Sequence, residues 1–179
     1  MLIASPDPLL RDDVIAMRPW TMDDIPAVTA ACQDPEIARW TSVPTPYSVD
    51  DARAFLEHAV RTDVEDRVAL AVTNADGTLV GSMTLWMPRP GVAEFGYWAA
   101  REARGRGYTP RALRLLARWA LDTLDVSRLQ LGTLPGNSPS ERVAQKVGFS
   151  REGVLRSYFD QRGERRDMVM WSLLPGELR

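Results

Sequence analysis

The segment RGRGYT (104–109) combines two arginines and two glycines directly before a run of residues with helical spacing. A glycine-rich loop at the start of a helix exposes backbone N–H groups, and the helix macrodipole favours negative charge there. The glycines let an anion approach the backbone closely, and the arginines add charge-assisted donors. We therefore predict a phosphate-binding loop. The alternative is a solvated basic turn, with Thr109 as the helix cap and Pro110 at the first helical position.

Other nucleotide-binding motifs fit this loop poorly. A P-loop, GxxxxGK[ST], needs a lysine that the loop lacks, and a dinucleotide fingerprint, GxGxxG, needs a third glycine where Pro110 stands. Nucleic-acid binding favours basic residues interleaved with aromatic ones across a face, whereas these arginines gather at one helix entrance. The formal charge of −2 and the isoelectric point near 5.5 also argue against a nucleic-acid partner.

Glu94 is a second residue with chemical potential, and it lies in a predicted strand. Side chains alternate between the two faces of a strand, so Glu94 shares a face with Gly96 and Trp98, opposite Phe95 and Tyr97. A carboxylate among apolar and aromatic neighbours either faces solvent or is held in a cleft. The adjacent glycine leaves room beside this carboxylate.

The elements that must position these residues alternate between strand and helix patterns without a long linker or repeat, which indicates one mixed α/β unit. Apolar stripes and cap residues predict helices at 21–33, 48–60, 110–124 and 138–148. Strand patterns lie at 14–19, 68–73, 79–87, 92–100, 127–133, 149–159 and 165–174, with the sequence NADG (74–77) as a hairpin turn.

The helix boundaries have residue-level signals. Thr21 and Ser48 are the predicted N-caps of the first two helices. The helix at 138–148 has a predicted capping box from Ser138 to Glu141, and Gly148 is its predicted terminator. The helix at 110–124 has a core-facing stripe, formed by Leu113, Leu116, Ala117, Ala120, Leu121 and Leu124.

Length and composition set the wider limits. The 179 residues suit one domain at 13–179, preceded by a loose arm at 1–12. Cys32 is the only cysteine and His58 the only histidine, which excludes an intrachain disulfide and leaves no basis for a metal site. No apolar run approaches the length of a membrane span, and there is no signal-peptide pattern at the start. We expect a cytoplasmic protein with no membrane partner.

Three segments together resemble the GNAT superfamily of acyl-CoA-dependent N-acetyltransferases. RGRGYT is similar to its pyrophosphate motif, [RQ]-x-x-G-x-[GA], AEFGYWAA to its fourth strand, and NSPSERVAQKVGF (137–149) to its N-x-x-S-x-x-V-x-x-K-x-G-F segment. The similarity to the ribosomal-protein N-acetyltransferase branch covers about nine tenths of the chain, from MRPWTMDD to DMVMWSLLP. It implies a single, mostly antiparallel sheet with a splayed central strand pair and flanking helices.

The resemblance implies acetyl-CoA as cosubstrate and transfer of its acetyl group to a primary amine, either a protein amino terminus or a small molecule. Glu94 is then the general base, and Ser140 takes the place of a tyrosine acid, because Ala144 stands at that tyrosine's position. With no cysteine near these segments, we expect direct transfer in a ternary complex. The residues expected to bind acetyl-CoA are Trp98, Ala99, Ala100, Arg104, Gly105, Arg106, Gly107, Tyr108, Thr109 and Asn137.

The sequence indicates the acceptor substrate less clearly than it indicates acetyl-CoA. Candidate pocket residues are Trp40, Trp86, Tyr158 and Asp167, although tryptophans are also common core residues. Thr109 departs from the family's Gly or Ala, and Pro110 removes one backbone donor. These departures leave a non-catalytic acyl-CoA sensor as the alternative function. Relatives of this family often dimerise, so a homodimer is also an expectation.

Overall fold

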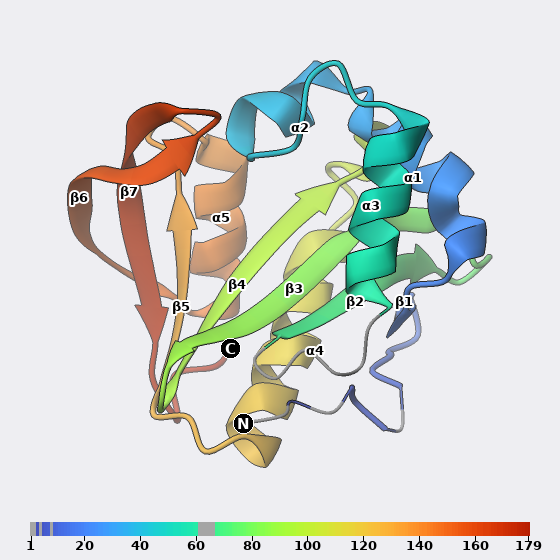
Figure 1. Cartoon of the computed structure of the whole chain (residues 1–179). Helices are drawn as coiled ribbons and strands as arrows, with labels where there is room; N and C mark the ends of the chain where they lie inside the picture. The colour runs from blue at the N-terminus through green and yellow to red at the C-terminus, as the bar shows by residue number, and fades with distance from the viewer. Residues whose placement is uncertain (1–2, 4, 8, 61–66) are drawn as a thin grey trace.

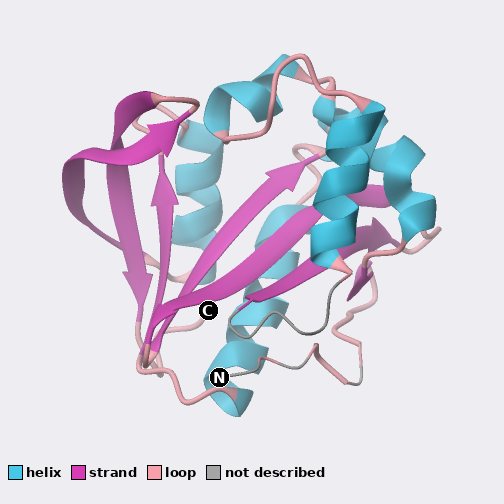
Figure 2. Ribbon diagram, in the orientation of Figure 1, coloured by secondary structure: helices cyan, strands magenta, loops and turns pink. Residues whose placement is uncertain are grey.

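The computed structural model describes residues 3, 5–7, 9–60 and 67–179. A seven-stranded sheet runs through the molecule in the order β1-β2-β3-β4-β5-β7-β6 (Figures 1 and 2). Its strands are β1 Ile15–Pro19, β2 Arg67–Asn74, β3 Leu79–Arg89, β4 Val92–Ala99, β5 Arg128–Thr133, β6 Ser150–Gln161 and β7 Glu164–Leu173. The helices are α1 Ile25–Cys32, α2 Pro35–Trp40, α3 Val49–Ala59, α4 Tyr108–Thr123 and α5 Ser138–Val147, with single 3₁₀ turns at Met22–Asp24 and Arg101–Ala103. The predicted mixed α/β architecture is confirmed.

The strands β4 and β5 separate along their length, as Figure 1 shows. They form the sheet's parallel pair, while the other neighbouring strands pair antiparallel. Their pairing covers only Val92–Phe95 on β4 and Arg128–Leu131 on β5. The remainder of each strand has no partner across this gap, so the predicted splayed pair is confirmed.

Helices cover both faces of the sheet. On one face, α4 and α5 bury the larger apolar cluster, in which Leu113 and Leu116 of α4 are fully buried against Phe95 and Leu131. On the other face, α1 and α3 enclose a smaller cluster around Trp20, with Ala52 and Leu56 of α3. The predicted stripe of α4 is therefore a core stripe, with Ala112 as a further buried member and Leu121 and Leu124 at its partly buried margin.

Two predicted helix starts need correction. The helix α4 begins at Tyr108 and is capped by Gly107, whose φ of 82° only glycine adopts without strain, so Thr109 is not the cap. The cap of α5 is Asn137, whose side-chain oxygen accepts from Ser140 N at 3.3 Å, and Ser138 is already helical. The predicted capping box at Ser138 is therefore wrong. The predicted terminator, Gly148, is confirmed by its φ of 110°.

The segment 1–12, expected to be a loose arm, makes several contacts where it is described. Ile3 is buried in the larger cluster. The Leu10 carbonyl accepts from Met17 N at 2.8 Å, and Asp12 forms a 2.8 Å ion pair with Arg111 of α4. None of the described helices is long and apolar enough to cross a membrane.

Candidate active site

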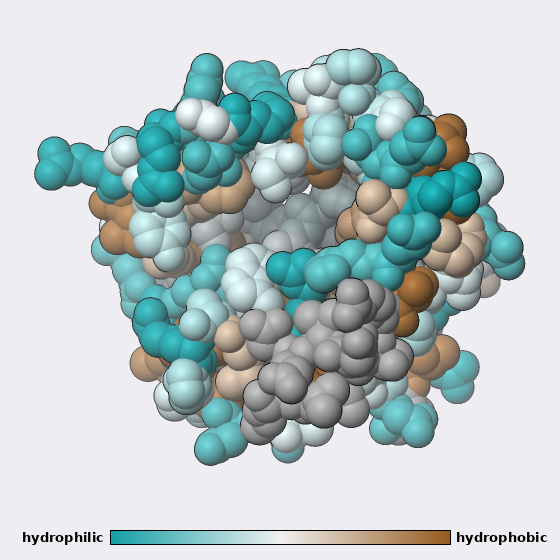
Figure 3. All heavy atoms as spheres, viewed as in Figure 1, coloured by the Kyte–Doolittle hydropathy of each residue, from teal (hydrophilic) through white to brown (hydrophobic). Residues whose placement is uncertain are grey.

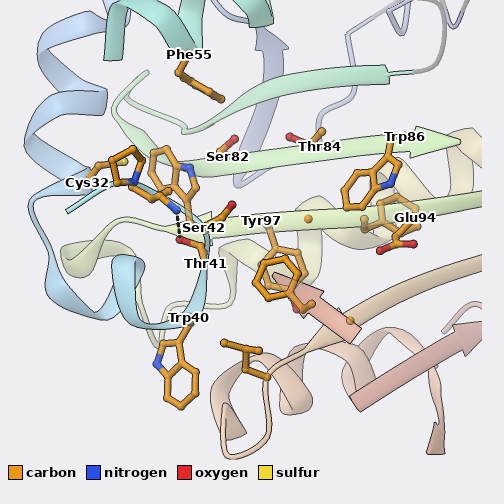
Figure 4. Close-up of a pocket in the computed structure, with 18 of the residues that line it drawn as sticks. Cys32, Trp40, Thr41, Ser42, Phe55, Ser82, Thr84, Trp86, Glu94 and Tyr97 are labelled. Atoms are coloured by element: carbon orange, nitrogen blue, oxygen red, sulfur yellow. Dashed lines mark hydrogen bonds between the residues drawn. The ribbon is translucent and has the colours of Figure 1, made fainter. Parts of the chain in front are cut away.

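Two pockets meet where β4 and β5 separate. One is a cavity of about 580 Å³ that we call the aromatic pocket, because Trp40, Tyr47, Phe55, Trp86, Trp98, Tyr158 and Phe159 contribute to its walls. It includes the residues of Figure 4, and the space-filling view shows a hollow near the centre of this face (Figure 3). The other, of about 460 Å³, is the loop groove, between the 104–110 segment and α5. The residues common to both are Trp40, Thr41, Phe95, Gly96, Tyr97, Trp98 and Gly132.

The glycine loop forms one wall of the loop groove. Gly105 and Gly107 have φ values of 77° and 82°, and a Cβ built on either would meet no atom within 4 Å. Their backbone is therefore open on the groove side, as a phosphate cradle requires. Pro110 is the third residue of α4 and lacks an N–H, so the amides of Tyr108 and Thr109 remain as the free donors of the first helical turn.

The two arginines of this loop have different environments. Arg104 forms a 2.7 Å ion pair with the buried Asp34 and donates to the Ala99 carbonyl at 3.0 Å. Its guanidinium thus ties the loop to α2 and β4, a structural role that the sequence did not reveal. Arg106 is exposed and does not line the groove. The groove's other cations are Arg142 and Lys146 of α5, which sequence analysis did not select.

The backbone of β4 shows which amides face the splay. Ala100 N donates to Val80 O at 3.0 Å, so the Ala100 amide, expected to bind acetyl-CoA, is already bonded on the β3 side. Successive amides of a strand point to opposite edges. The N–H groups of Tyr97 and Ala99 therefore point toward the gap, while that of Trp98 points toward β3. Of the three residues of this segment expected to bind acetyl-CoA, Trp98, Ala99 and Ala100, only Ala99 directs its N–H into the gap, and Tyr97 is a further donor there.

Glu94 lies in the paired part of β4 and lines the aromatic pocket beside Trp86 (Figure 4). Its Oε2 accepts from Gln130 Nε2 at 2.6 Å. Burial raises the pKa of Glu94, and the Gln130 hydrogen bond and the charge of Arg89 lower it in part. A carboxyl with a raised pKa in a cleft is a candidate for proton transfer near neutral pH.

Ser140 faces the same gap from α5. Its Oγ lies 2.7 Å from the Tyr97 hydroxyl, and Asn137 holds its backbone N–H. Tyr97 is among the residues common to both pockets, and burial raises its pKa to about 12, so the phenol keeps its proton at neutral pH. Sequence analysis assigned Ser140 a role but missed Tyr97. The alternation along β4 had placed Tyr97 on the face away from Glu94, and only the contact with α5 reveals its importance.

The family model described as Acetyltransferase (GNAT) domain matches residues 15–150. The chain belongs to the GNAT acetyltransferase family. It is 27% identical over 174 residues to the uncharacterized N-acetyltransferase p20 of Bacillus licheniformis, covering 94% of this chain and 97% of that one. A solved structure described as a probable acetyltransferase has a TM-score of 0.84 and 26% identity, covering 94% and 98% of the two chains.

A further relative of this GNAT chain is the [ribosomal protein uS5]-alanine N-acetyltransferase of Escherichia coli K12. The two are 24% identical over 111 residues, which are 62% of this chain and 54% of the relative. The p20 and E. coli relatives are both named as N-acetyltransferases. This GNAT chain is accordingly an N-acetyltransferase by family, and its recognised similarity to the ribosomal-protein branch is confirmed.

The aromatic pocket of this GNAT domain includes most of the predicted acceptor residues. Trp40, Trp86 and Tyr158 line it. Asp167 lines neither pocket, and its Oδ1 accepts from Ser157 N at 2.9 Å at an irregularity of the β6–β7 pair. The structure therefore places Asp167 outside the pocket in which it was expected. Among the described residues, no group of three potential metal ligands occurs.

The wall between α2 and α3 is fastened to the β6–β7 turn. Gln161 Nε2 donates to the carbonyls of Arg39 and Thr41, each at 2.9 Å. Arg162 NH1 donates to Ala38 O at 2.8 Å and to Val43 O at 2.9 Å. These bonds satisfy carbonyls at the end of α2 and in the loop that follows. The hairpin and α2 thus close one side of the aromatic pocket, as their proximity in Figure 1 indicates.

Proposed function

We propose that this protein transfers an acetyl group from acetyl-CoA to a primary amine, by direct attack while both substrates are bound. The observation that carries the proposal is the junction of the two pockets at the splay. Glu94 lines the aromatic pocket two residues before Gly96, which lines both pockets, and Ser140 lines the loop groove beside Tyr97, which also lines both. Base and hydrogen-bond donor thus approach the same opening from opposite sides.

The loop groove suits the donor substrate. The open backbone of Gly105 and Gly107 and the start of α4 suit its pyrophosphate, and Arg142 and Lys146 add positive charge to the same groove. The unpaired edges of β4 and β5 suit the extended pantetheine arm, because its amides can take the place of the missing strand pairing. The N–H groups of Tyr97 and Ala99 would then face the thioester oxygen as it gains negative charge.

The aromatic pocket suits an amine that has no free carboxylate. Among the described residues that line it, the side chains able to carry charge at neutral pH are the acids Asp51 and Glu94, with no arginine, lysine or histidine. An ammonium group is attracted there, whereas a carboxylate would be buried without a partner. A protein amino terminus meets this requirement, and the similarity to a ribosomal-protein acetyltransferase supports it. A free amino acid does not.

The chemistry moves protons from nitrogen and to sulfur. The acceptor ammonium must lose one proton before its nitrogen can attack the thioester carbon, and Glu94 is the group that takes it, directly or through water. The nitrogen of the adduct then loses a second proton, to solvent. As the C–S bond breaks, its electron pair moves to sulfur, and the thiolate takes a proton from the Ser140 hydroxyl, which regains one from solvent. Cys32 also lines the aromatic pocket, but burial raises its pKa to about 12, so it is not the nucleophile of an acetyl-enzyme.

The test is a screen of peptides with free amino termini and of small amines, with acetyl-CoA as donor and free thiol release as the signal. Glu94→Gln should lower kcat about a hundredfold to ten-thousandfold with acetyl-CoA affinity retained. Free amino acids should react more slowly than their carboxyl amides. A Glu94→Gln enzyme with kcat within about threefold of the wild type, ~0.7 kcal/mol in activation free energy, would refute Glu94 as the base.

A further inference from the structure

Gln130 on β5 is a buried polar residue that the chemistry above does not use. It lies directly opposite Glu94 in the parallel pairing of β4 and β5, and it is 4% exposed. Its Nε2 donates to Glu94 Oε2 at 2.6 Å. Buried side-chain amides need hydrogen-bond partners. The groups that contact the Gln130 amide therefore determine whether its NH2 or its carbonyl oxygen faces Glu94.

The orientation of the Gln130 amide follows from its second partner. Arg128 Nε donates to Gln130 Oε1 at 3.0 Å. A guanidinium has donors and no acceptor, so reversing the amide would set N–H against N–H. Arg128 is itself fixed by two hydrogen bonds to Glu152, at 2.7 and 2.6 Å, and Ser172 donates to the same carboxylate at 2.8 Å. The amide nitrogen is therefore held toward Glu94.

This arrangement has two effects on Glu94. A donor that faces Oε2 stabilises the carboxylate more than the carboxylic acid. It also fixes Oε2, and Oε1 makes no hydrogen bond with any described residue, so Oε1 is the oxygen available to the acceptor. The other charged or titratable groups around Glu94 are Arg89 of β3 and, across the same pocket, Asp51 of α3 and Tyr158 of β6.

We propose that Gln130, oriented by Arg128, is a positioning residue that keeps Glu94 in its charged form and directs Oε1 toward the acceptor amine. The inference rests on the proposed function, because it requires Glu94 to be the base. Burial alone would favour the protonated acid, which cannot accept a proton. The Gln130 amide on β5 opposes this effect of burial, so the enzyme remains active at lower pH.

The test is the pH dependence of kcat/KM for Gln130→Met, which keeps the side-chain length and removes both hydrogen bonds. The acidic limb of the profile rises as Glu94 loses its proton. Without the Gln130 donor, this limb should move to higher pH by about one to two units, the value of one hydrogen bond to a charged group. The KM for acetyl-CoA should not change, since Gln130 does not line the loop groove.

The matched control is Thr73→Val. Thr73 is buried on β2, donates to the Ala16 carbonyl at 3.4 Å and lines neither pocket, so this variant loses a buried hydrogen bond of the sheet outside the contacts that orient Gln130. Its acidic limb should coincide with that of the wild type. A shift in both variants would mean a general disturbance of the sheet, and that result overturns the proposal.

A second variant covers the case in which Gln130→Met does not fold. Gln130→Glu keeps an acceptor for Arg128 and places a second carboxyl beside Glu94, which should move the limb upward because two adjacent carboxylates resist ionising together. If the acidic limb of the kcat/KM profile does not move in the variants that fold, Gln130 does not position Glu94. If Glu94→Gln is inactive in that case, the proposed function stands. If Glu94→Gln is fully active, Glu94 is not the base, whereas a wild type that releases no thiol with any peptide or amine refutes the proposed function.

Discussion

Replacing Gly107 with alanine separates the phosphate role of the glycine loop from its role in folding. Gly107 has a φ of 82° and caps α4. An alanine in this left-handed conformation costs about 1–2 kcal/mol of folding free energy. No atom lies within 4 Å of the new Cβ, so no steric clash adds to this cost. For a domain of this size, each kcal/mol lowers Tm by about 2–4 °C.

The same methyl group should have a larger effect on acetyl-CoA. Gly107 lines the loop groove, and a Cβ there would occupy open space beside the backbone that the proposed phosphate must approach closely. We expect the Kd for acetyl-CoA, measured by calorimetry, to rise at least tenfold, about 1.4 kcal/mol. Acetyl-CoA should also raise the Tm of the wild type more than that of the variant, because the stabilisation depends on affinity.

The matched control is Gly77→Ala, in the β2–β3 turn. Gly77 has a φ of 78°, and its Cβ position is equally open, but it lies outside both pockets. Both variants should lose similar stability, and only Gly107→Ala should lose acetyl-CoA affinity. Undiminished affinity in Gly107→Ala would refute the phosphate assignment. Unequal losses of stability would refute the strain argument.

Three further predictions follow from the same contacts. Tyr97→Phe should lower kcat by about fivefold, the value of one hydrogen bond of ~1 kcal/mol, and should have little further effect in a Ser140→Ala background. Equal effects in both backgrounds would mean that Tyr97 does not act through Ser140. Thr109→Ala should preserve or tighten acetyl-CoA binding, since it removes a β-branched side chain from the groove, and a tenfold loss would instead make the hydroxyl a ligand contact. The hydrogen bond from Arg18 lowers the pKa of Asp24, so its stabilisation is complete above the unfolded pKa of about 3.9 and is lost as pH falls through the folded pKa. Asp24→Asn should therefore show less loss of unfolding free energy between about pH 5 and pH 2 than the wild type, measured in urea.

Most of the fold could be predicted because its signals are local. The turn NADG lies between two strands with apolar patterning, and the stripe of α4 includes Leu113 and Leu116, which are completely buried. The short helix α2, Pro35–Trp40, was not predicted, and the other errors lie at helix starts, where several polar residues compete to be the cap. At α5 both Asn137 and Ser138 are residue types that commonly cap helices. The path of the chain before α5 makes Asn137 the cap.

Features of the candidate site that lie within one segment could be predicted from the sequence, whereas contacts between two distant segments could not. The glycine loop is continuous in sequence, and its open backbone was expected. The bonds of Arg104 to Asp34, and of Gln130 to Glu94, join residues far apart in the chain. Nothing in the local pattern around Arg104 distinguishes an arginine that binds phosphate from one that braces a loop.

The splay of β4 and β5 explains how residues from opposite faces of one sheet can serve one reaction. Glu94 shares its face with Trp98, which packs in the cluster beneath α1 and α3, whereas Tyr97 packs against the larger cluster beneath α4 and α5. In a continuous sheet the strand layer would separate them. Here the paired part of the two strands ends at Phe95 and Leu131, one residue beyond the pair of Glu94 and Gln130.

The two proposed roles therefore occupy different parts of β4. Glu94, the proposed base, lies in the paired part, where the register places Gln130 directly opposite it. Tyr97 lies in the unpaired part, where the missing neighbour leaves room for Ser140 of α5 to reach its hydroxyl. A substitution that extended the β4–β5 pairing by two residues would leave both side chains intact and still close the passage between the pockets.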